Sequence, residues 1–166
     1  MSRKMSIMVV DDEMIIRESF SQWFQKEGYE VSSAASGFEA LNKLKKYPFD
    51  ILFVDIKMPG MDGIELLQRV KQEYPQTFVV IITAYGSIDT SVNAMKMGAS
   101  DYLLKPFRPE QLNLVMEKIA QQKKLSLEID YLKGRLETST RFDNIIGQSE
   151  PMVKIFEIIP EVADID

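Results

Sequence analysis

The chain has 166 residues, of which 45% are hydrophobic and 27% are charged, enough to fold around one sizeable core. It contains no cysteine and no histidine, which excludes disulfide bonds, thiolate metal sites, histidine acid–base catalysis and every catalytic triad that uses histidine. No segment carries the basic patch expected of a domain that binds nucleic acid directly, and no run is long and apolar enough for a membrane span or a signal peptide. The lack of cysteine fits a reducing cytoplasm, where we expect the protein to be.

Five short runs of β-type residues alternate with segments of helical periodicity. Gly28 and Gly98 fall where the first and fourth helices are expected to end. Strict alternation implies right-handed crossovers and predicts an α/β fold with a doubly wound, five-stranded parallel sheet, flavodoxin-like, in the order 2-1-3-4-5. The predicted strands are residues 6–10, 29–34, 50–55, 78–83 and 101–104.

Acidic residues end two of these strands. The stretch IMVVDDE places Asp11 and Asp12 after the first strand, and Asp55 closes the third. In a doubly wound sheet these strand ends meet at the functional crevice. Three carboxylates there would repel one another unless a divalent cation lay among them, and oxygen ligands favour Mg²⁺. The alternative is that an individual aspartate only caps a helix or a loop.

A hydroxyl and an ammonium group are expected at the same edge. Thr83 ends the fourth strand, and Lys105 follows the fifth. Together with a carboxylate nucleophile and a cation, these groups can hold a phosphoryl group. The sequence therefore predicts a phosphorylation site at this edge of the sheet.

Residues 1–122 resemble the receiver domain of a bacterial two-component response regulator. The resemblance rests on the stretches VVDDE, LFVDIKMPGMDG, IITAYG and ASDYLLKPF, which occur in this order at strand ends. It implies that Asp55 accepts a phosphoryl group from a sensor histidine kinase. It also implies that Asp11, Asp12, Asp55 and the backbone carbonyl of Lys57 hold Mg²⁺.

The resemblance assigns further roles around the acceptor. Lys105 would pair with the phosphoryl oxygens, Thr83 would move to hydrogen-bond one of them, and Tyr102 would turn inward as Thr83 moves. The Lys105–Pro106 bond is expected to be cis. The surface of the fourth helix, fifth strand and fifth helix would then change. As an alternative, Tyr102 is an ordinary core residue.

Two residues are candidates for tuning the lifetime of the phosphorylated state. Lys57 lies two residues after Asp55, and Tyr85 lies two residues after Thr83, where both would flank the water that attacks the phosphoryl group. The alternative is that both are ordinary loop residues. We expect slow self-dephosphorylation and no further enzymatic activity. One alternative is a haloacid-dehalogenase-type phosphatase, but that class typically has a second aspartate where this chain has Lys57. The other alternative is a receiver-like module that dimerises without phosphorylation.

One long helix with an apolar seam is expected over residues 109–138. Leu125, Ile129, Leu132 and Leu136 alternate in spacings of four and three, as in two heptads of a coiled coil. This pattern predicts a parallel homodimer linker. The alternative is a helix that folds back or frays, since two heptads are short for a coiled coil.

The tail, residues 143–166, resembles the start of the AAA+ ATPase domain that follows the receiver in NtrC-like, sigma-54-dependent transcriptional activators. The matching pattern is IIGxSxxM, whereas Pro160 departs from the helix expected there. We therefore expect a fragment with a receiver, a linker and a truncated ATPase start. The implied partner is the ATPase domain of the full-length chain.

Overall fold

The computed structural model describes residues 4–84, 86–139, 141–142 and 145–146. It forms two compact units, Met1–Val115 and Met116–Asp166. From the sequence we expected the first domain to end at residue 122, somewhat later in the chain.

The first unit is built on a five-stranded parallel sheet in the order β2-β1-β3-β4-β5. This order confirms the predicted doubly wound fold. The observed strands begin and end within one residue of the predicted runs. They are β1 (Ser6–Val10), β2 (Glu30–Ala34), β3 (Ile51–Asp55), β4 (Phe78–Thr83) and β5 (Asp101–Leu104).

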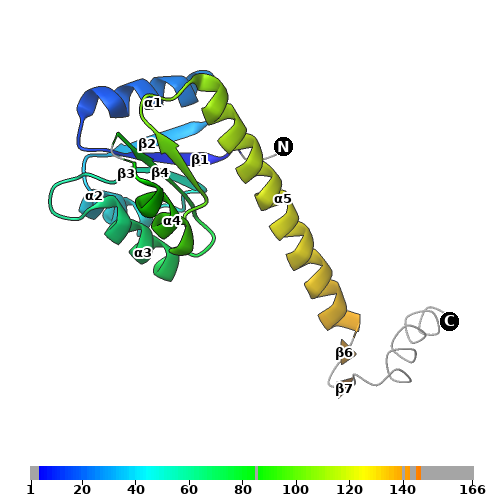
Figure 1. Cartoon of the computed structure of the whole chain (residues 1–166). Coiled ribbons are helices and arrows are strands. Elements are labelled where there is room, and N and C mark those ends of the chain that lie inside the picture. The colour runs from blue at the N-terminus through cyan, green and yellow to red at the C-terminus, as the bar shows by residue number, and fades with distance from the viewer. Residues whose placement is uncertain (1–3, 85, 140, 143–144, 147–166) are drawn as a thin grey trace. The chain divides into compact units, whose positions relative to one another are not determined.

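Helices cover both faces of this sheet. The helix after β1 lies on one face, and the three helices after β2, β3 and β4 lie on the other (Figure 1). All five residues of both β1 and β3 are buried for this reason, which explains their continuous apolar runs. The helices are α1 (Met14–Lys26), α2 (Gly37–Leu44), α3 (Gly63–Glu73), α4 (Ile88–Lys96) and α5 (Pro109–Ser139).

An aromatic cluster fills the α1 face of the sheet. The ring of Phe24 lies 4.8 Å from Phe53 of β3, and Phe20 lies 6.1 Å from the same ring. Burying rings of this size contributes about 2 kcal/mol each through the hydrophobic effect alone. The cluster fixes α1, and with it the loop that joins β1 to α1.

Local signals in the sequence explain where the helices begin and end. Ser36, Asp62 and Ser87 cap α2, α3 and α4 through side-chain oxygens that accept backbone N–H groups. Gly28 and Gly98 follow α1 and α4 with φ angles of 88° and 95°, as predicted for helix ends.

Three apolar residues that recur at helical spacing in the sequence are not core residues. Phe38 on α2 and Val92 and Met95 on α4 are exposed. The stripes on α2 and α4 are therefore wider than the surface that the sheet covers.

The second unit contains most of α5 and a short antiparallel pair. Strands β6 (Arg141–Phe142) and β7 (Ile145–Ile146) pair with each other and were not predicted. Most of the proposed ATPase start, residues 143–166, lies outside the described residues. No helix among the described residues is both long and apolar enough to cross a membrane.

The predicted seam of α5 is exposed as far as it is described. Leu125, Ile129 and Leu132 each expose about half of their surface, whereas the side chain of Leu136 lies outside the described residues. Within the described part of the second unit, these side chains are available to another chain. The homodimer linker stays a prediction.

Candidate functional site

The predicted site residues gather at the carboxyl edge of the sheet. Asp11 follows β1, Asp55 is the last residue of β3, Thr83 is the last residue of β4, and Lys105 follows β5. Asp11, Asp55 and Thr83 are buried. Parallel strands bring their ends to one edge, so residues distant in sequence meet here.

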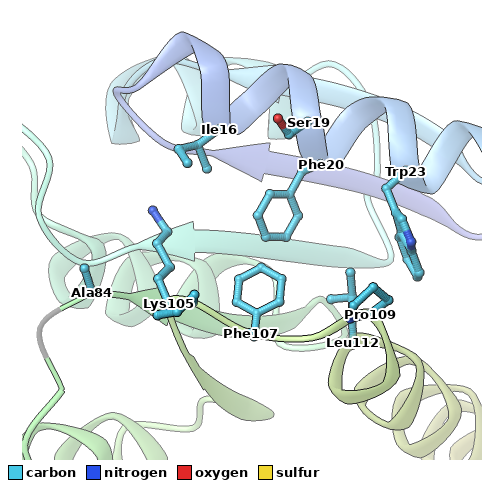
Figure 2. Close-up of a pocket in the computed structure, with 10 residues that line it drawn as sticks. Ile16, Ser19, Phe20, Trp23, Ala84, Lys105, Phe107, Pro109 and Leu112 are labelled. Carbon is cyan, nitrogen blue, oxygen red and sulfur yellow. The ribbon is translucent and has the colours of Figure 1, made fainter.

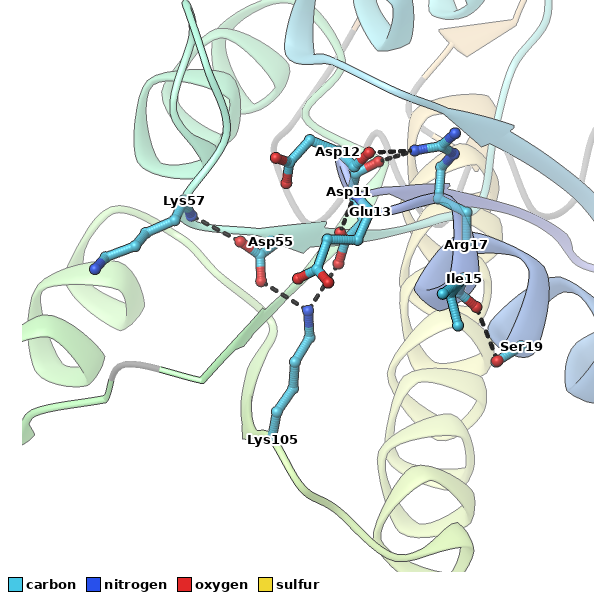
Figure 3. Close-up of polar contacts among 9 residues, drawn as sticks. All are labelled: Asp11, Asp12, Glu13, Ile15, Arg17, Ser19, Asp55, Lys57 and Lys105. Carbon is cyan, nitrogen blue, oxygen red and sulfur yellow. Dashed lines mark hydrogen bonds and ion pairs between the residues drawn. The ribbon is translucent and has the colours of Figure 1, made fainter.

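Lys105 bridges the two buried carboxylates. Its Nζ donates to Asp11 Oδ2 at 2.7 Å and to Asp55 Oδ1 at 3.0 Å (Figure 3). The side chains are 16% exposed for Lys105, 4% for Asp11 and 10% for Asp55, so water screens these ion pairs weakly. The ammonium group therefore offsets part of the repulsion between the carboxylates. From the sequence we had expected a divalent cation alone to do this.

The environment raises the pKa values of both Lys105 and Asp55. Burial alone would lower the pKa of Lys105, but its bonds with Asp11 and Asp55 outweigh burial and raise it. Burial raises the pKa of Asp55 above its usual range, with a smaller contribution from the nearby Asp11 charge, and the bonds to Lys105 and Lys57 N–H only partly oppose this.

Backbone N–H groups occupy the second oxygen of each buried carboxylate. Glu13 N–H donates to Asp11 Oδ1 at 2.9 Å, and Lys57 N–H donates to Asp55 Oδ2 at 2.7 Å. Both bonds close short loops directly after a strand. Each carboxylate is thus oriented by the backbone of the loop that carries it.

The donors at this edge suit Mg²⁺ in kind. Asp11, Asp12 and Asp55 offer only oxygen ligands, and Asp12 is exposed at the end of β1, with its carboxylate extended toward the side where Asp55 and Lys57 lie (Figure 3). Within the described ranges, no three acidic side chains are gathered closely enough to bind a metal ion together. Lys105 and the two backbone N–H groups instead take the oxygens of Asp11 and Asp55.

A glycine that the sequence analysis did not single out allows the acceptor loop to close. A Cβ atom on Gly63 would lie 2.2 Å from the carbonyl oxygen of Asp55. Gly63 N–H also donates to the carbonyl oxygen of Ile56 at 2.9 Å. The start of α3 thus packs directly against the end of β3. The signal in the sequence that could have predicted this close packing is the Asp-Gly dipeptide at the start of the helix.

The two residues predicted to switch lie in different surroundings. Thr83 is almost fully buried, whereas Tyr102 is half-buried and its hydroxyl group lies 3.4 Å from Thr90 Oγ1 at the start of α4. Gly86 is also near, because a Cβ atom there would lie 3.2 Å from the Tyr102 hydroxyl group. The side chain of Tyr102 therefore contacts α4 and the loop before it. Tyr85 lies outside the described residues.

Lys57 is exposed, and its side chain points away from Asp55 (Figure 3). Its backbone N–H holds the Asp55 carboxylate. The predicted roles of its carbonyl group as a metal ligand and of its side chain in tuning the lifetime stay predictions.

An apolar cavity lies beside the stem of Lys105. It has a volume of about 520 Å³ and is lined by residues of α1, of the segment after β5 and of the start of α5, and by Ala84 after β4 (Figure 2). Phe20 and Phe107 face each other in its wall with ring centroids 5.2 Å apart. The Lys105–Pro106 bond at its edge is cis, as expected.

The chain belongs to the response regulator receiver domain family, since residues 7–117 match the model of that family. It is therefore a regulatory domain. It is similar to the regulatory protein AtoC of Escherichia coli (strain K12), with 34% identity over 157 residues that cover 95% of this chain and 34% of AtoC. It is also 31% identical to the C4-dicarboxylate transport transcriptional regulatory protein DctD of Rhizobium meliloti (strain 1021), over 100% of this chain and 36% of DctD.

Solved structures show the same fold. The chemotaxis protein CheY4 of Vibrio cholerae superposes with a TM-score of 0.67 at 34% identity, covering 70% of this chain and 99% of CheY4. NtrX from Brucella abortus gives a TM-score of 0.74 at 32% identity, covering 97% of this chain and 35% of NtrX. The chain thus spans about a third of the length of the curated relatives it matches.

Proposed function

We propose that this domain is a phosphorylation switch in which Asp55 accepts a phosphoryl group from a sensor histidine kinase. The observation that supports this most strongly is the contact of the Lys105 ammonium group with both Asp55 and Asp11 at the carboxyl edge of the sheet. A cation held beside a buried carboxylate can stabilise the charge that builds up on a transferring phosphoryl group. Because such a switch works together with transcription machinery, we also propose a cytoplasmic location.

The chemistry needs no general base from this chain. An oxygen of the ionised Asp55 carboxylate attacks phosphorus, the P–N bond of the donor phosphohistidine breaks, and the leaving imidazole takes up a proton. The product is an acyl phosphate on Asp55. Water then cleaves its O–P bond slowly, releasing inorganic phosphate and restoring the carboxylate. Lys57 and Tyr85 are proposed to tune the rate of this second step.

Mg²⁺ is the proposed cofactor. Asp12, Asp55 and the backbone carbonyl of Lys57 would hold it, with Asp11 as the second member of the acid pair. The ion would supply positive charge beside the phosphoryl oxygens. Lys105 would pair with the phosphoryl group, because its ammonium group has three N–H donors and the carboxylates of Asp11 and Asp55 take only two of them.

Thr83 and Tyr102 are the proposed switch residues. The hydroxyl group of Thr83 would bond a phosphoryl oxygen, and Tyr102 would leave the neighbourhood of Thr90 and turn toward the space that Thr83 vacates. The surface of α4, β5 and α5 would change as a result. Phosphorylation thereby biases two conformations of one surface through a single added charge.

We further propose that this surface controls a sigma-54-activating AAA+ ATPase domain through a dimeric linker. Relatives such as DctD are described as transcriptional regulatory proteins and extend well beyond the region that this chain covers. The exposed residues Leu125, Ile129 and Leu132 support a linker that pairs with a second copy. Residues 143–166 are the proposed start of the ATPase domain.

A phosphorylation-independent interaction module is the remaining alternative. The position of Lys57 two residues after Asp55 disfavours a haloacid-dehalogenase-type phosphatase, because that class typically has an acid there. The Lys105 bridge does not by itself separate a working acceptor from an inert one. Phosphorylation must therefore be tested directly.

The test is intact mass after incubation with Mg²⁺ and a small acyl phosphate. Wild type is expected to gain one phosphoryl group, and Asp55→Asn none. Asp62→Asn is the matched control, since Asp62 is an exposed helix cap outside the site, and it should be phosphorylated as wild type is. No adduct on folded wild-type protein would favour the interaction module instead.

A further inference from the structure

The loop that carries the acid pair is held by an arginine from α1. Arg17 Nη1 donates to the carbonyl oxygen of Asp11 at 2.6 Å and to the carbonyl oxygen of Asp12 at 2.9 Å (Figure 3). One nitrogen atom thus ties together two consecutive peptide groups. These are the peptide groups that set the directions of the two aspartate side chains.

The start of α1 has no side-chain cap of its own. The N-cap residue Glu13 makes no side-chain capping bond, and the first turn of α1 contains no acidic residue. The start of the helix is instead tied to the acid loop, because Glu13 N–H donates to the Asp11 carboxylate and Arg17 reaches back to the loop carbonyls. Arg17 therefore binds the loop and the helix into one unit.

Two cations hold Asp11 from opposite sides. Lys105 bonds its carboxylate at 2.7 Å, and Arg17 bonds its carbonyl oxygen at 2.6 Å. Figure 3 shows Arg17 on the far side of the loop from Asp55, with the Asp12 carboxylate extended in the other direction. Holding the carbonyl groups on one side keeps the carboxylates on the side of the acceptor.

We propose that Arg17 is a positioning residue that presents the carboxylates of Asp11 and Asp12 to a divalent cation beside Asp55. This inference rests on the proposed Mg²⁺-dependent function. Without Arg17 the carbonyl groups of Asp11 and Asp12 lose the donor that they share, and ordering the loop would have to accompany cation binding. Groups that orient metal ligands in this way typically change metal affinity by about 10- to 100-fold when they are removed.

A positioning role of Arg17 and a purely electrostatic role predict opposite effects on cation binding. The pKa of Glu39 on α2 is lowered mainly by the bond from Ala35 N–H and by Lys43, and the charge of Arg17 contributes a little in the same direction. A purely electrostatic role would, however, weaken cation binding, since Arg17 is itself positive. The positioning role predicts the opposite sign, with weaker Mg²⁺ binding when the arginine is removed.

The sign of the effect is therefore the test. Calorimetric titration of the full chain with Mg²⁺ is expected to give a dissociation constant about 10-fold higher for Arg17→Met than for wild type. Arg17→Lys, which keeps the charge but carries it on a flexible stem, should also bind Mg²⁺ more weakly. Arg69→Met is the matched control, because Arg69 only pairs with Glu65 on the exposed surface of α3, and it should bind as wild type does.

A rate measurement separates positioning from general damage. With a small acyl phosphate as donor, the Arg17 variants should need more Mg²⁺ for half-maximal phosphorylation but should approach the wild-type rate at saturating Mg²⁺. Unchanged or tighter Mg²⁺ binding in Arg17→Met overturns the inference, and so does wild-type affinity in Arg17→Lys. If Arg17→Met does not fold, Arg17→Lys decides alone. A wild type that binds Mg²⁺ without being phosphorylated would contradict the proposed function. The inference about Arg17 would then be decided by the Mg²⁺ dissociation constants alone.

Discussion

Lys105 Nζ lies 2.7 Å from Asp11 Oδ2, although 94 residues separate the two in sequence. The same nitrogen bonds Asp55, so one ammonium group joins the ends of β1 and β3 to the segment after β5. Both carboxylates are buried, and each takes its remaining bond from the backbone of its own loop. The stability of the fold and the chemistry of the site are therefore coupled through Lys105.

Replacing Lys105 should destabilise the domain. In Lys105→Met the two buried carboxylates lose their common partner, and we expect unfolding to require about 3 kcal/mol less free energy at neutral pH. The loss should shrink on acidification, because protonated carboxyl groups no longer need the ammonium group. Urea unfolding at several pH values measures this, with exposed Lys57→Met as the control that should stay near wild type. Equal losses at acidic and neutral pH would contradict the account.

Replacing Asp55 should have the opposite effect on stability. Burial raises the pKa of Asp55 in the folded state, so the folded protein binds this proton more tightly than the unfolded chain does. Burying the ionised carboxylate therefore lowers the stability of wild type at neutral pH. This loss of stability starts to be relieved as the pH falls through the folded pKa, which lies above the usual 3.8. Asparagine carries no charge, so we expect a higher Tm for Asp55→Asn than for wild type at neutral pH.

The pH dependence of that gain is the informative part. The difference in Tm between Asp55→Asn and wild type should begin to shrink as the pH falls through the folded pKa of Asp55, and it should disappear below the lower pKa of the unfolded chain. Asp62→Asn serves as the control, because asparagine caps a helix about as well as aspartate does. A Tm gain that grew on acidification would show that the pKa of Asp55 is lowered instead.

Adding one carbon atom at Gly63 should disturb the acceptor loop. In Gly63→Ala the new Cβ would lie 2.2 Å from the Asp55 carbonyl oxygen, so β3 and α3 must move apart. We expect a loss of about 2 to 4 kcal/mol in unfolding free energy, together with slower phosphorylation. Gly134→Ala is the matched control, since a Cβ atom added there would meet nothing within 4 Å beyond its own helix backbone, and it should stabilise α5 by up to about 1 kcal/mol. Equal stability of the two variants would contradict this.

The seam of α5 can be tested with a pair of charge substitutions on one helix. Ile129→Asp places a charge on the predicted seam, whereas Leu127→Asp places it two residues away, on an exposed position outside the seam. If the seam pairs two chains, sedimentation should show a dimer for wild type and Leu127→Asp and a monomer for Ile129→Asp. The same mass for all three proteins would remove the linker proposal.

The location of the site could be predicted from the sequence because topology alone determines it. Alternation of strands and helices places Asp11, Asp55, Thr83 and Lys105 at one edge whatever their rotamers are. The contact that joins them could not be predicted in the same way. Whether an ammonium group or a metal ion lies between two carboxylates depends on side-chain reach and distances of a few tenths of an ångström.

Other differences have equally physical causes. The raised pKa of Asp55 depends on burial depth, which no local pattern encodes. Phe38 and Val92 follow helical spacing but are exposed, because a periodic pattern does not show how wide the covering surface is. Arg17 was missed since its importance comes from reaching back over the start of α1 to the carbonyl groups of Asp11 and Asp12.

The measurement that tests the central claim most directly is the position of the phosphoryl group in the chain. Wild-type protein phosphorylated with a small acyl phosphate and Mg²⁺ is reduced with borohydride, which converts an aspartyl phosphate to homoserine, and is then mapped by peptide mass spectrometry. The account predicts homoserine at position 55 alone. Homoserine at position 11 or 12, or none in a folded sample, would contradict it.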